Sequence, residues 1–296
     1  MKYSYFPGCN LKTNAKEYEH TAVEVSKILD AELVEMPVFN CCGTVHSMAS
    51  DNTMRRIAPV RILSRSEEHQ KELEDTNNTV VTLCSMCSST LKVVNEEVKE
   101  DEEMLQKINW QLERDNLKYS GHSEVKHYLE ILRDEVGFEE IVKKVKKQLK
   151  GMKVASYYGC MLLHPDKAKI DDSETPTVME TLTLALGAEV VDWPYFKTCC
   201  GSYHVVDKED IVNNQILKIT EGAKKRGANA IITACPLCAY NLDSQQVFLQ
   251  KKGIIKETIP IFYFTQLMAI ALGIKLENFE DHHVDPKPLL KSLGLI

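Results

Sequence analysis

The segment 79–87, Thr-Val-Val-Thr-Leu-Cys-Ser-Met-Cys, runs from a short apolar stretch directly into a Cys-x-x-Cys motif. The same pattern returns at 230–238 as Ala-Ile-Ile-Thr-Ala-Cys-Pro-Leu-Cys, so Cys84 and Cys235 are equivalent positions 151 residues apart. A short apolar run of this kind is typical of a buried strand. A helix that begins at the motif would offer its free backbone N–H groups to thiolates. We therefore expect each segment to be a strand that ends at a ligand site.

The remaining cysteines extend this repeat outward over the chain. A Cys-Cys-Gly motif precedes each Cys-x-x-Cys motif, and a single lead cysteine precedes each Cys-Cys-Gly motif. The lead cysteines are 151 positions apart, and the Cys-Cys-Gly motifs are 158 positions apart. All ten cysteines of the chain belong to the pattern: Cys9, Cys41, Cys42, Cys84 and Cys87, and then Cys160, Cys199, Cys200, Cys235 and Cys238. The near-constant offset indicates a tandem duplication, with one domain over 1–150, which includes a helical insertion, and the other over 151–296.

Each half is predicted to alternate strands and helices. In the first half, strands at 3–6 and 32–36 flank a helix at 15–29. In the second half, strands at 153–158 and 189–194 flank a helix at 177–186 that Gly187 closes. This order predicts an α/β fold of two domains related by a pseudo-twofold axis, each a small parallel sheet flanked by helices. Ligands of such sheets bind beyond the carboxyl ends of the strands, where the three cysteine elements of each half converge.

Composition limits the classes of partner and the compartment. The net charge of −7 argues against a nucleic-acid partner, because binding to the phosphate backbone draws on a basic surface. The most apolar stretch, 259–272, is shorter than the roughly 18 residues of a transmembrane segment, and Pro260 and Gln266 interrupt it. The N-terminal residues do not resemble a signal peptide, so we expect a cytoplasmic protein with reduced cysteines and no transmembrane segment.

Five thiolates per half favour a polynuclear metal site. A tetrahedral zinc ion or an ordinary cubane iron–sulfur cluster needs four ligands, so five is one too many for either. Iron–sulfur ligation is therefore the leading hypothesis, and Gly43 and Gly201 would let backbone N–H groups approach cluster sulfurs. The competing hypothesis is two structural zinc sites, which would leave one cysteine in each half unused. A dithiol exchange enzyme is a weaker alternative, because one Cys-x-x-Cys motif suffices for that chemistry.

These motifs resemble the cysteine-rich CCG domain in tandem, and over almost the whole chain they resemble the B-type, catalytic subunits of the heterodisulfide reductase family of methanogenic archaea. The resemblance implies that each five-cysteine set binds a noncubane [4Fe-4S] cluster and that the two clusters face one another across a substrate cavity. It also implies an enzyme of methanogenesis that reduces the mixed disulfide of coenzyme M and coenzyme B to two thiols. Cleavage of a disulfide takes two electrons and each cluster carries one, so two clusters match the reaction.

The resemblance further implies an electron-bifurcating complex. The expected partners are a ferredoxin-like heterodisulfide reductase subunit that carries cubane clusters and a flavin-containing subunit that connects to hydrogenase or formate dehydrogenase. The chain has no Gly-x-Gly-x-x-Gly motif at a strand-to-helix junction, so it is not expected to bind flavin or nucleotide itself. Electrons would therefore reach it from those partners.

Five further residues are candidates for roles in such a site. His46 and His204 occupy matching positions after the two Cys-Cys-Gly motifs, and a histidine there could donate protons to the products. The alternative is a histidine that only hydrogen-bonds the loop. Because both substrate thiols carry acidic groups in the family, Lys12, Arg55 and Lys197 are candidate anion anchors, although surface cations are more often simply solvated.

Two other functions stay open at this point. CCG domains also occur in iron–sulfur subunits of lactate, glycolate or glycerol-3-phosphate dehydrogenases and in thiol:fumarate reductase. A protein of another class would be a scaffold module stabilised by zinc. The segment after Gly273, with Asp281-His282-His283, is expected to be a polar tail that either folds over the second domain or contacts a partner.

Overall fold

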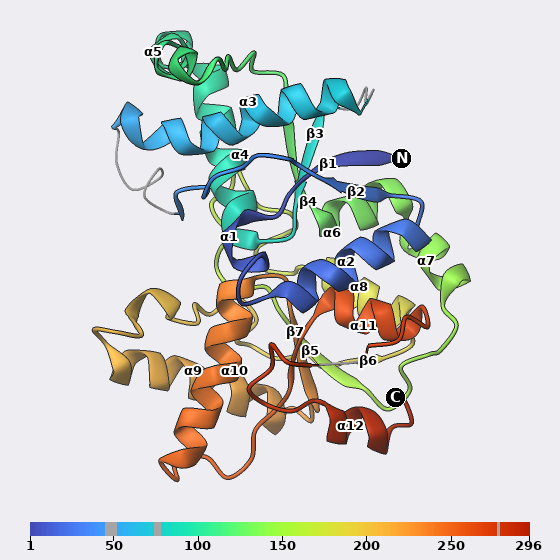
Figure 1. Cartoon of the computed structure of the whole chain (residues 1–296). Coiled ribbons are helices and arrows are strands. Elements are labelled where there is room, and N and C mark those ends of the chain that lie inside the picture. Colours follow the sequence, from blue (N-terminus) through green and yellow to red (C-terminus); the bar gives the residue numbers. More distant parts are fainter. Residues whose placement is uncertain (45–51, 74–77, 277–278) are drawn as a thin grey trace.

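The computed structural model of the chain describes residues 1–44, 52–73, 78–276 and 279–296. Within these ranges the strands form two four-stranded sheets, one for each half of the chain (Figure 1). The sheet orders are β2-β1-β3-β4 and β6-β5-β7-β8, and every pairing is parallel. The strands are β1 (Lys2–Phe6), β2 (Glu32–Glu35), β3 (Thr79–Thr82), β4 (Glu124–His127), β5 (Lys153–Tyr157), β6 (Glu189–Val190), β7 (Ala230–Thr233) and β8 (Ile261–Tyr263). The predicted α/β fold with small parallel sheets is confirmed.

The fourth strand of each sheet was not predicted. In the first sheet Thr82 of β3 pairs with His127 of β4, and in the second sheet Thr233 of β7 pairs with Tyr263 of β8. Strand β4 is short and has two charged residues, so its sequence gives no apolar signal. Strand β8 runs without a turn into a helix, and its apolar residues merge with those of the helix. Both strands depend on pairing with β3 or β7 rather than on a local pattern.

Helices cover both sheets and carry the cysteine motifs. In the first half they are α1 (Gly8–Leu11), α2 (Lys16–Ile28), α3 (Ile57–Glu72), α4 (Ser85–Glu100), α5 (Glu102–Leu112), α6 (Tyr128–Ile131) and α7 (Phe138–Lys144). In the second half they are α8 (Val178–Ala185), α9 (Glu209–Lys225), α10 (Pro236–Lys251), α11 (Phe264–Ala271) and α12 (Lys287–Ser292). Short 3₁₀ turns lie at η2 (Thr53–Arg56), η3 (Glu113–Asp115) and η5 (Ser202–His204), and a π-helical turn lies at η4 (Leu132–Val136). The predicted helices at 15–29 and 177–186 correspond to α2 and α8.

Helices from each half pack against the other half. Helix α11 lies beside α2 in the middle of the molecule, and α7 packs against α8 (Figure 1). The rings of Tyr18 in α2 and Tyr263 at the end of β8 are stacked, with centroids 4.1 Å apart. Beside them the hydroxyl oxygens of Thr21 and Thr265 are 2.7 Å apart. Buried apolar side chains from both halves consequently form one continuous core.

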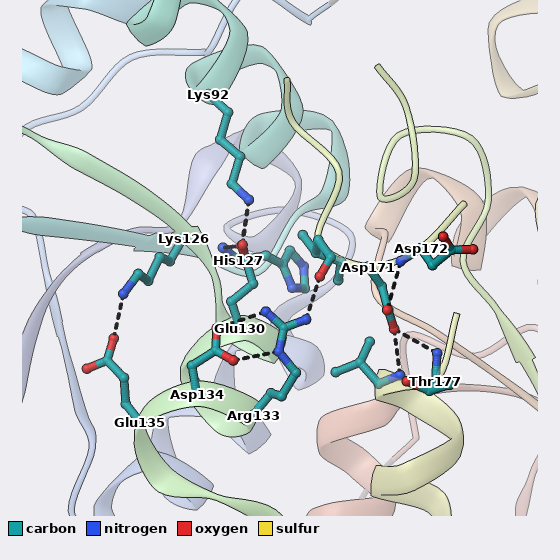
Figure 2. A network of polar contacts seen from close by, with 12 residues as sticks. Lys92, Lys126, His127, Glu130, Arg133, Asp134, Glu135, Asp171, Asp172 and Thr177 are labelled. Carbon is teal, nitrogen blue, oxygen red and sulfur yellow. Dashed lines mark hydrogen bonds and ion pairs between the residues drawn. The ribbon is translucent and has the colours of Figure 1, made fainter. Parts of the chain in front are cut away.

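A polar network ties the turn after β4 to the second half (Figure 2). Lys92 of α4 binds the carboxylate of Glu130 through Nζ–O distances of 2.7 Å, and that carboxylate also accepts the backbone N–H of His127. Arg133 in η4 donates to the carbonyl oxygen of Ile170 at 2.5 Å. Arg133 thus joins the first half to a backbone group of the second half, while Lys92 and Glu130 hold the end of β4 from within the first half.

No helix in the part of the chain that the structure describes is long and apolar enough to cross a membrane.

Candidate metal centre

The two Cys-x-x-Cys motifs meet where the two halves join. Strand β3 leads into Cys84, the N-cap of α4, and β7 leads into Cys235, the N-cap of α10; both cap residues have extended backbones. The backbone N–H of Ser85 donates to the carbonyl oxygen of Ala234 at 3.3 Å, and the Ser85 hydroxyl donates to the same oxygen at 2.9 Å. The Cys84 and Cys235 thiols influence one another across this junction: Cys235 raises the pKa of Cys84, and Cys84 contributes, after Cys238, to lowering the pKa of Cys235. Two helix N-termini therefore face one shared region, which favours negative charge there.

Sulfur contacts continue from this junction into each half in the same way. The Sγ atoms of Cys42 and Cys87 are 3.4 Å apart, and those of Cys200 and Cys238 are 3.5 Å apart. All ten cysteines are free thiols in this structure, so none forms a disulfide. The structure thus places together cysteines that are far apart in sequence, as the alignment of the two halves predicts.

The five thiols of the second set share one cavity. Among the described residues, no three His, Cys, Asp or Glu side chains surround a point at which a single metal ion could be held. Yet one cavity is lined by all five cysteines of the second set, Cys160, Cys199, Cys200, Cys235 and Cys238. A mononuclear zinc site needs four ligands around one point, whereas an iron–sulfur cluster spreads its ligands over several irons. The second set thus offers one thiol more than a mononuclear zinc site uses.

Two glycines let the backbone approach the sulfurs closely. Gly8 and Gly159, each directly before a lead cysteine, have φ values of +72° and +65°. A Cβ atom at Gly8 would lie 3.1 Å from Cys87 Sγ, and one at Gly159 would lie 3.3 Å from Cys238 Sγ. Only glycine combines this backbone conformation with this closeness. The glycines of the Cys-Cys-Gly motifs were expected to bring backbone N–H groups to sulfur, and the N–H of Gly201 does donate to Cys199 Sγ at 3.4 Å. The role of Gly8 and Gly159 was not predicted, although the repeated Gly-Cys pair at the 151-residue offset was visible in the sequence.

Contacts between neighbouring thiols shift their pKa values in opposite directions. Hydrogen bonds from Cys41 and Cys87 hold the pKa of Cys42 well below its ordinary value. In the second set, hydrogen bonds from Cys238 and Cys84 lower the pKa of Cys235 in the same way. Metals bind thiolates rather than thiols. The same contacts raise the pKa of the partner thiols Cys87 and Cys238, so in each half one sulfur is favoured as a thiolate and its partner as a thiol.

Three buried polar side chains that sequence reasoning missed support the junction. The Tyr18 hydroxyl donates to the carbonyl oxygen of Leu83 at 2.8 Å, and His127 Nε2 lies 2.9 Å from the same oxygen. Burial lowers the pKa of His127 to about 4, so the ring is neutral at physiological pH. Tyr263 stacks on Tyr18 and completes the group. A buried histidine with no motif around it gives no sequence signal, and only the position of β4 brings it here.

The structure describes four of the five predicted proton donors and anion anchors. His46 lies outside the described residues. His204 is exposed in η5, with its Nδ1 3.5 Å from Asp207 Oδ1. Lys12 pairs with Glu19 at 2.7 Å and with Glu35 at 2.6 Å. Lys197 pairs with Glu174 at 2.6 Å, and Arg55 is exposed. The structure therefore does not bring these cations together at the junction.

Apolar side chains surround the cysteines of the second set. Met86, Met161, Leu237 and Tyr203 line the same cavity as the five thiols. The Tyr203 hydroxyl lies 3.4 Å from the sulfur of Met86, so the two residues close the cavity from opposite halves. Met86 and Leu237 are the equivalent third positions of the two Cys-x-x-Cys motifs. The site thus combines soft thiol ligands with an apolar wall.

The C-terminal segment folds over both halves rather than over the second alone. Residues 279–284 cross between α2 and α10. The carboxylate of Glu17 accepts the backbone N–H of Glu280 at 2.6 Å, and that of Asp243 accepts the backbone N–H groups of His283 and Val284. Burial raises the pKa of Glu17 to about 7 and that of Asp243 to about 7. This segment therefore adds a further connection between the halves beside the tyrosine stack.

This chain is similar in sequence or in fold to several known proteins. The sequence model of the cysteine-rich (CCG) domain matches twice, at residues 3–92 and 154–243. The 8-methylmenaquinol:fumarate reductase membrane anchor subunit of Wolinella succinogenes is 34% identical over 95% of this chain and 96% of its own length. The B subunit of the ferredoxin:CoB-CoM heterodisulfide reductase of Methanosarcina mazei is 28% identical over 92% of this chain and 89% of its own length. A hypothetical protein from Helicobacter pylori shares the fold, with a TM-score of 0.69, 13% identity and 96% of this chain covered; the chain spans 52% of its length.

Proposed function

The chain belongs to the cysteine-rich (CCG) domain family, and from this premise we propose that it is the redox-active subunit of an oxidoreductase of the heterodisulfide reductase type. In this proposal Cys9, Cys41, Cys42, Cys84 and Cys87 bind one iron–sulfur cluster, and Cys160, Cys199, Cys200, Cys235 and Cys238 bind another. A noncubane [4Fe-4S] cluster in each half would account for the fifth cysteine.

One observation carries the proposal: the two Cys-x-x-Cys motifs are hydrogen-bonded to each other. The hydroxyl and the backbone N–H of Ser85 both donate to the carbonyl oxygen of Ala234, which directly precedes Cys235, so the two motifs are held together rather than merely close. Two one-electron centres brought to one region can serve a reaction that needs two electrons. Separate sites at distant surfaces would have no such use.

The reaction that we propose first is reduction of a disulfide. Its S–S bond breaks, two electrons and two protons are taken up, and two thiols leave. The clusters, when bound, supply the electrons one at a time. The helix N-termini at Cys84 and Cys235 favour the negative charge that develops beside them. His204 remains a candidate proton donor at the exposed side of the second set, and the mixed disulfide of coenzyme M and coenzyme B is the specific substrate to test.

Electrons for this reaction would come from a partner protein. Candidates are a ferredoxin-like heterodisulfide reductase subunit and, through it, a flavin-containing subunit linked to hydrogenase or formate dehydrogenase. The relatives that are named as parts of larger reductases support an assembly of this kind.

A second candidate is a redox subunit of a fumarate reductase that takes electrons from a quinol. It rests on the Wolinella succinogenes relative, which is 34% identical over 95% of this chain. In this reaction the same two cysteine sets would take electrons from the quinol instead of delivering electrons to a disulfide.

Metal analysis of protein purified without oxygen tests the cofactor. We expect about eight irons and a matching amount of sulfide per chain, as two four-iron clusters require. Cys87→Ala and Cys238→Ala should each remove one cluster, leaving about four irons. The far-ultraviolet circular dichroism of both variants serves as the control for folding.

Turnover then separates the two candidates. With reduced methyl viologen as electron donor, consumption of the coenzyme M–coenzyme B disulfide would support the first. Reduction of the clusters by menadiol without disulfide turnover would support the second. Two zinc ions and no sulfide would contradict both and leave the structural scaffold.

A further inference from the structure

A tyrosine holds the segment that leads into the second Cys-Cys-Gly motif. Tyr157 ends β5 and is fully buried, and its hydroxyl donates to the carbonyl oxygen of Thr198 at 2.6 Å. Thr198 directly precedes Cys199, so this hydrogen bond attaches the start of the motif to the sheet. An added Cβ at Gly159 would lie 3.3 Å from Cys238 Sγ and 3.6 Å from the Tyr157 hydroxyl oxygen. The hydroxyl therefore lies on the side of the strand that faces the cysteines.

The equivalent residue of the first half has no hydroxyl. Phe6 ends β1 and corresponds to Tyr157 at the 151-residue offset. An added Cβ at Gly8 would lie 3.1 Å from Cys87 Sγ and 3.9 Å from the nearest ring atoms of Phe6. The phenylalanine ring thus occupies the matching place, but it cannot donate to the backbone before Cys41.

Asn40 holds the first Cys-Cys-Gly motif instead. It precedes the motif directly, as Thr198 does in the second half. Its Nδ2 donates to the carbonyl oxygen of Cys41 at 2.9 Å and to that of Ala58, in the first turn of α3, at 3.0 Å. Its Oδ1 accepts a hydrogen bond from Arg65 Nη1, also in α3, at 3.2 Å. The first motif is therefore attached to a helix through an amide, whereas the second is attached to a strand through a phenol.

We propose that Tyr157 and Asn40 are positioning residues, each for the cluster of its own half. Tyr157 acts on the second motif through the backbone of Thr198, and Asn40 acts on the first through the backbone of Cys41. The inference rests on the proposed function, in which each Cys-Cys-Gly motif supplies two ligands of one cluster. Because the two contacts are made by unrelated residues in different halves, either cluster can be loosened without the other.

Release of iron to a chelator measures how firmly each cluster is held. The Cys87→Ala and Cys238→Ala variants, with about four irons each, report on one cluster at a time. In Cys87→Ala, which keeps the second cluster, we expect Tyr157→Phe to speed anaerobic iron release to ferrozine about fivefold, because one hydrogen bond to the ligand backbone is lost. In Cys238→Ala, which keeps the first cluster, the same change should leave the rate unaltered.

Asn40→Ala should give the opposite pattern. In Cys238→Ala we expect iron release about fivefold to tenfold faster, because two hydrogen bonds of the amide nitrogen are lost. In Cys87→Ala the rate should not change. A crossed pattern of this kind separates positioning of a cluster from general loosening of the fold, which would speed release in both backgrounds.

Tyr158→Phe and Asn109→Ala are matched controls. Tyr158 follows Tyr157 in the chain and is also buried, but its hydroxyl donates to the carboxylate of Glu180. Asn109 in α5 bridges backbone groups as Asn40 does, but both groups belong to Tyr119. Each control removes a hydrogen bond of the same kind away from the Cys-Cys-Gly motifs, so neither should alter iron release.

The outcomes distinguish this inference from the function on which it rests. Iron-loaded protein in which Tyr157→Phe speeds release equally in both backgrounds, or behaves like Tyr158→Phe, would overturn the inference while the proposed clusters stand. Loss of far-ultraviolet circular dichroism in Tyr157→Phe would also overturn it, because the hydroxyl would then hold the whole domain rather than one ligand segment. Protein that contains no iron would overturn the proposed function, and the inference would fail with it.

Discussion

The two halves of the molecule carry the same five cysteines on the same scaffold, but they support the junction unequally. At the position after the first cysteine of the Cys-x-x-Cys motif, the first half has Ser85 and the second has Pro236. Ser85 gives both its N–H and its hydroxyl to the other half. Proline has no N–H and no side-chain donor, so it cannot return the contact. At this pair of positions the crossing hydrogen bonds therefore come from the first half, although both halves keep their five cysteines.

The last residues of the two fourth strands also differ in how they support the junction. His127 ends β4 and Tyr263 ends β8, at equivalent positions in the two sheets. His127 contacts the Leu83 carbonyl directly, whereas Tyr263 stacks on Tyr18, whose hydroxyl binds that carbonyl. Both strands thus support the backbone before Cys84.

Each half contributes a carboxyl group to the connection made by the C-terminal segment, Glu17 from the first half and Asp243 from the second, and this connection predicts the largest effect. Asp243 has a pKa of about 7 in the folded protein, above the 3.8 of a free side chain. Between pH 4 and 7 the folded state therefore binds a proton that the unfolded state has lost. Stability should fall as the pH rises through this window, by up to about 1.4 kcal/mol per pH unit, and then level off above pH 7.

Asp243→Asn should remove this part of the slope. Thermal unfolding followed by circular dichroism at pH 5, 6, 7 and 8 measures it, and the advantage of the original chain over the variant should shrink as the pH rises. Glu17→Gln is the matching change in the first half, with a smaller effect expected because Glu17 is less buried than Asp243. Burial lowers the pKa of His282 to about 4, below this pH range; because its Nε2 lies 3.8 Å from Glu17 Oε2, Asp243→Asn is the cleaner of the two variants. Parallel curves for Asp243→Asn and the original chain would refute the assignment.

Sequence reasoning succeeded where a pattern was local and repeated. The central strands of both sheets, the helices α2 and α8 and the alignment of the cysteines follow from apolar runs and from the 151-residue offset. The boundary near Gly151 stays a prediction, because the buried side chains of both halves form one core.

Sequence reasoning did not predict the contacts between residues that lie far apart in the chain. Nothing in the local sequence signals that Lys197 meets Glu174, 23 residues away, or that Lys12 meets Glu35. The role of His127 depends on a strand that only pairing defines. The expected anion anchors were therefore the least secure part of the site, since charge pairing is decided by the fold.

The second prediction asks whether the two halves hold their sulfurs equally closely. Gly8→Ala would place a Cβ 3.1 Å from Cys87 Sγ, so we expect a loss of about 2 kcal/mol of unfolding free energy and part of the iron, because the left-handed backbone and the contact both cost energy. Gly159→Ala should cost slightly less, because its Cβ would lie 3.3 Å from Cys238 Sγ. Denaturant unfolding and iron content measure both.

Gly253→Ala separates the two contributions. Gly253 has a φ of +71°, close to that of Gly8, and nothing lies within 4 Å of its added Cβ. We expect about 1 kcal/mol of destabilisation from the backbone alone and full iron content. If Gly8→Ala behaved like Gly253→Ala in both measurements, the close approach to the sulfur would have no energetic meaning.

The smallest expected effect tests the one-sided connection itself. Ser85→Ala removes the hydroxyl that binds Ala234 but keeps the backbone N–H, so about 1 kcal/mol of unfolding free energy should be lost. Ser88 is the control: it is equally buried in the same helix, and its hydroxyl has no hydrogen-bond partner among the described residues. Ser88→Ala should be neutral or slightly stabilising, because it removes an unpaired buried polar group. Equal losses from both changes would mean that the crossing hydroxyl does not hold the halves together. The halves would then be held together by the backbone N–H of Ser85 and by the stacked rings of Tyr18 and Tyr263, which Ser85→Ala leaves in place.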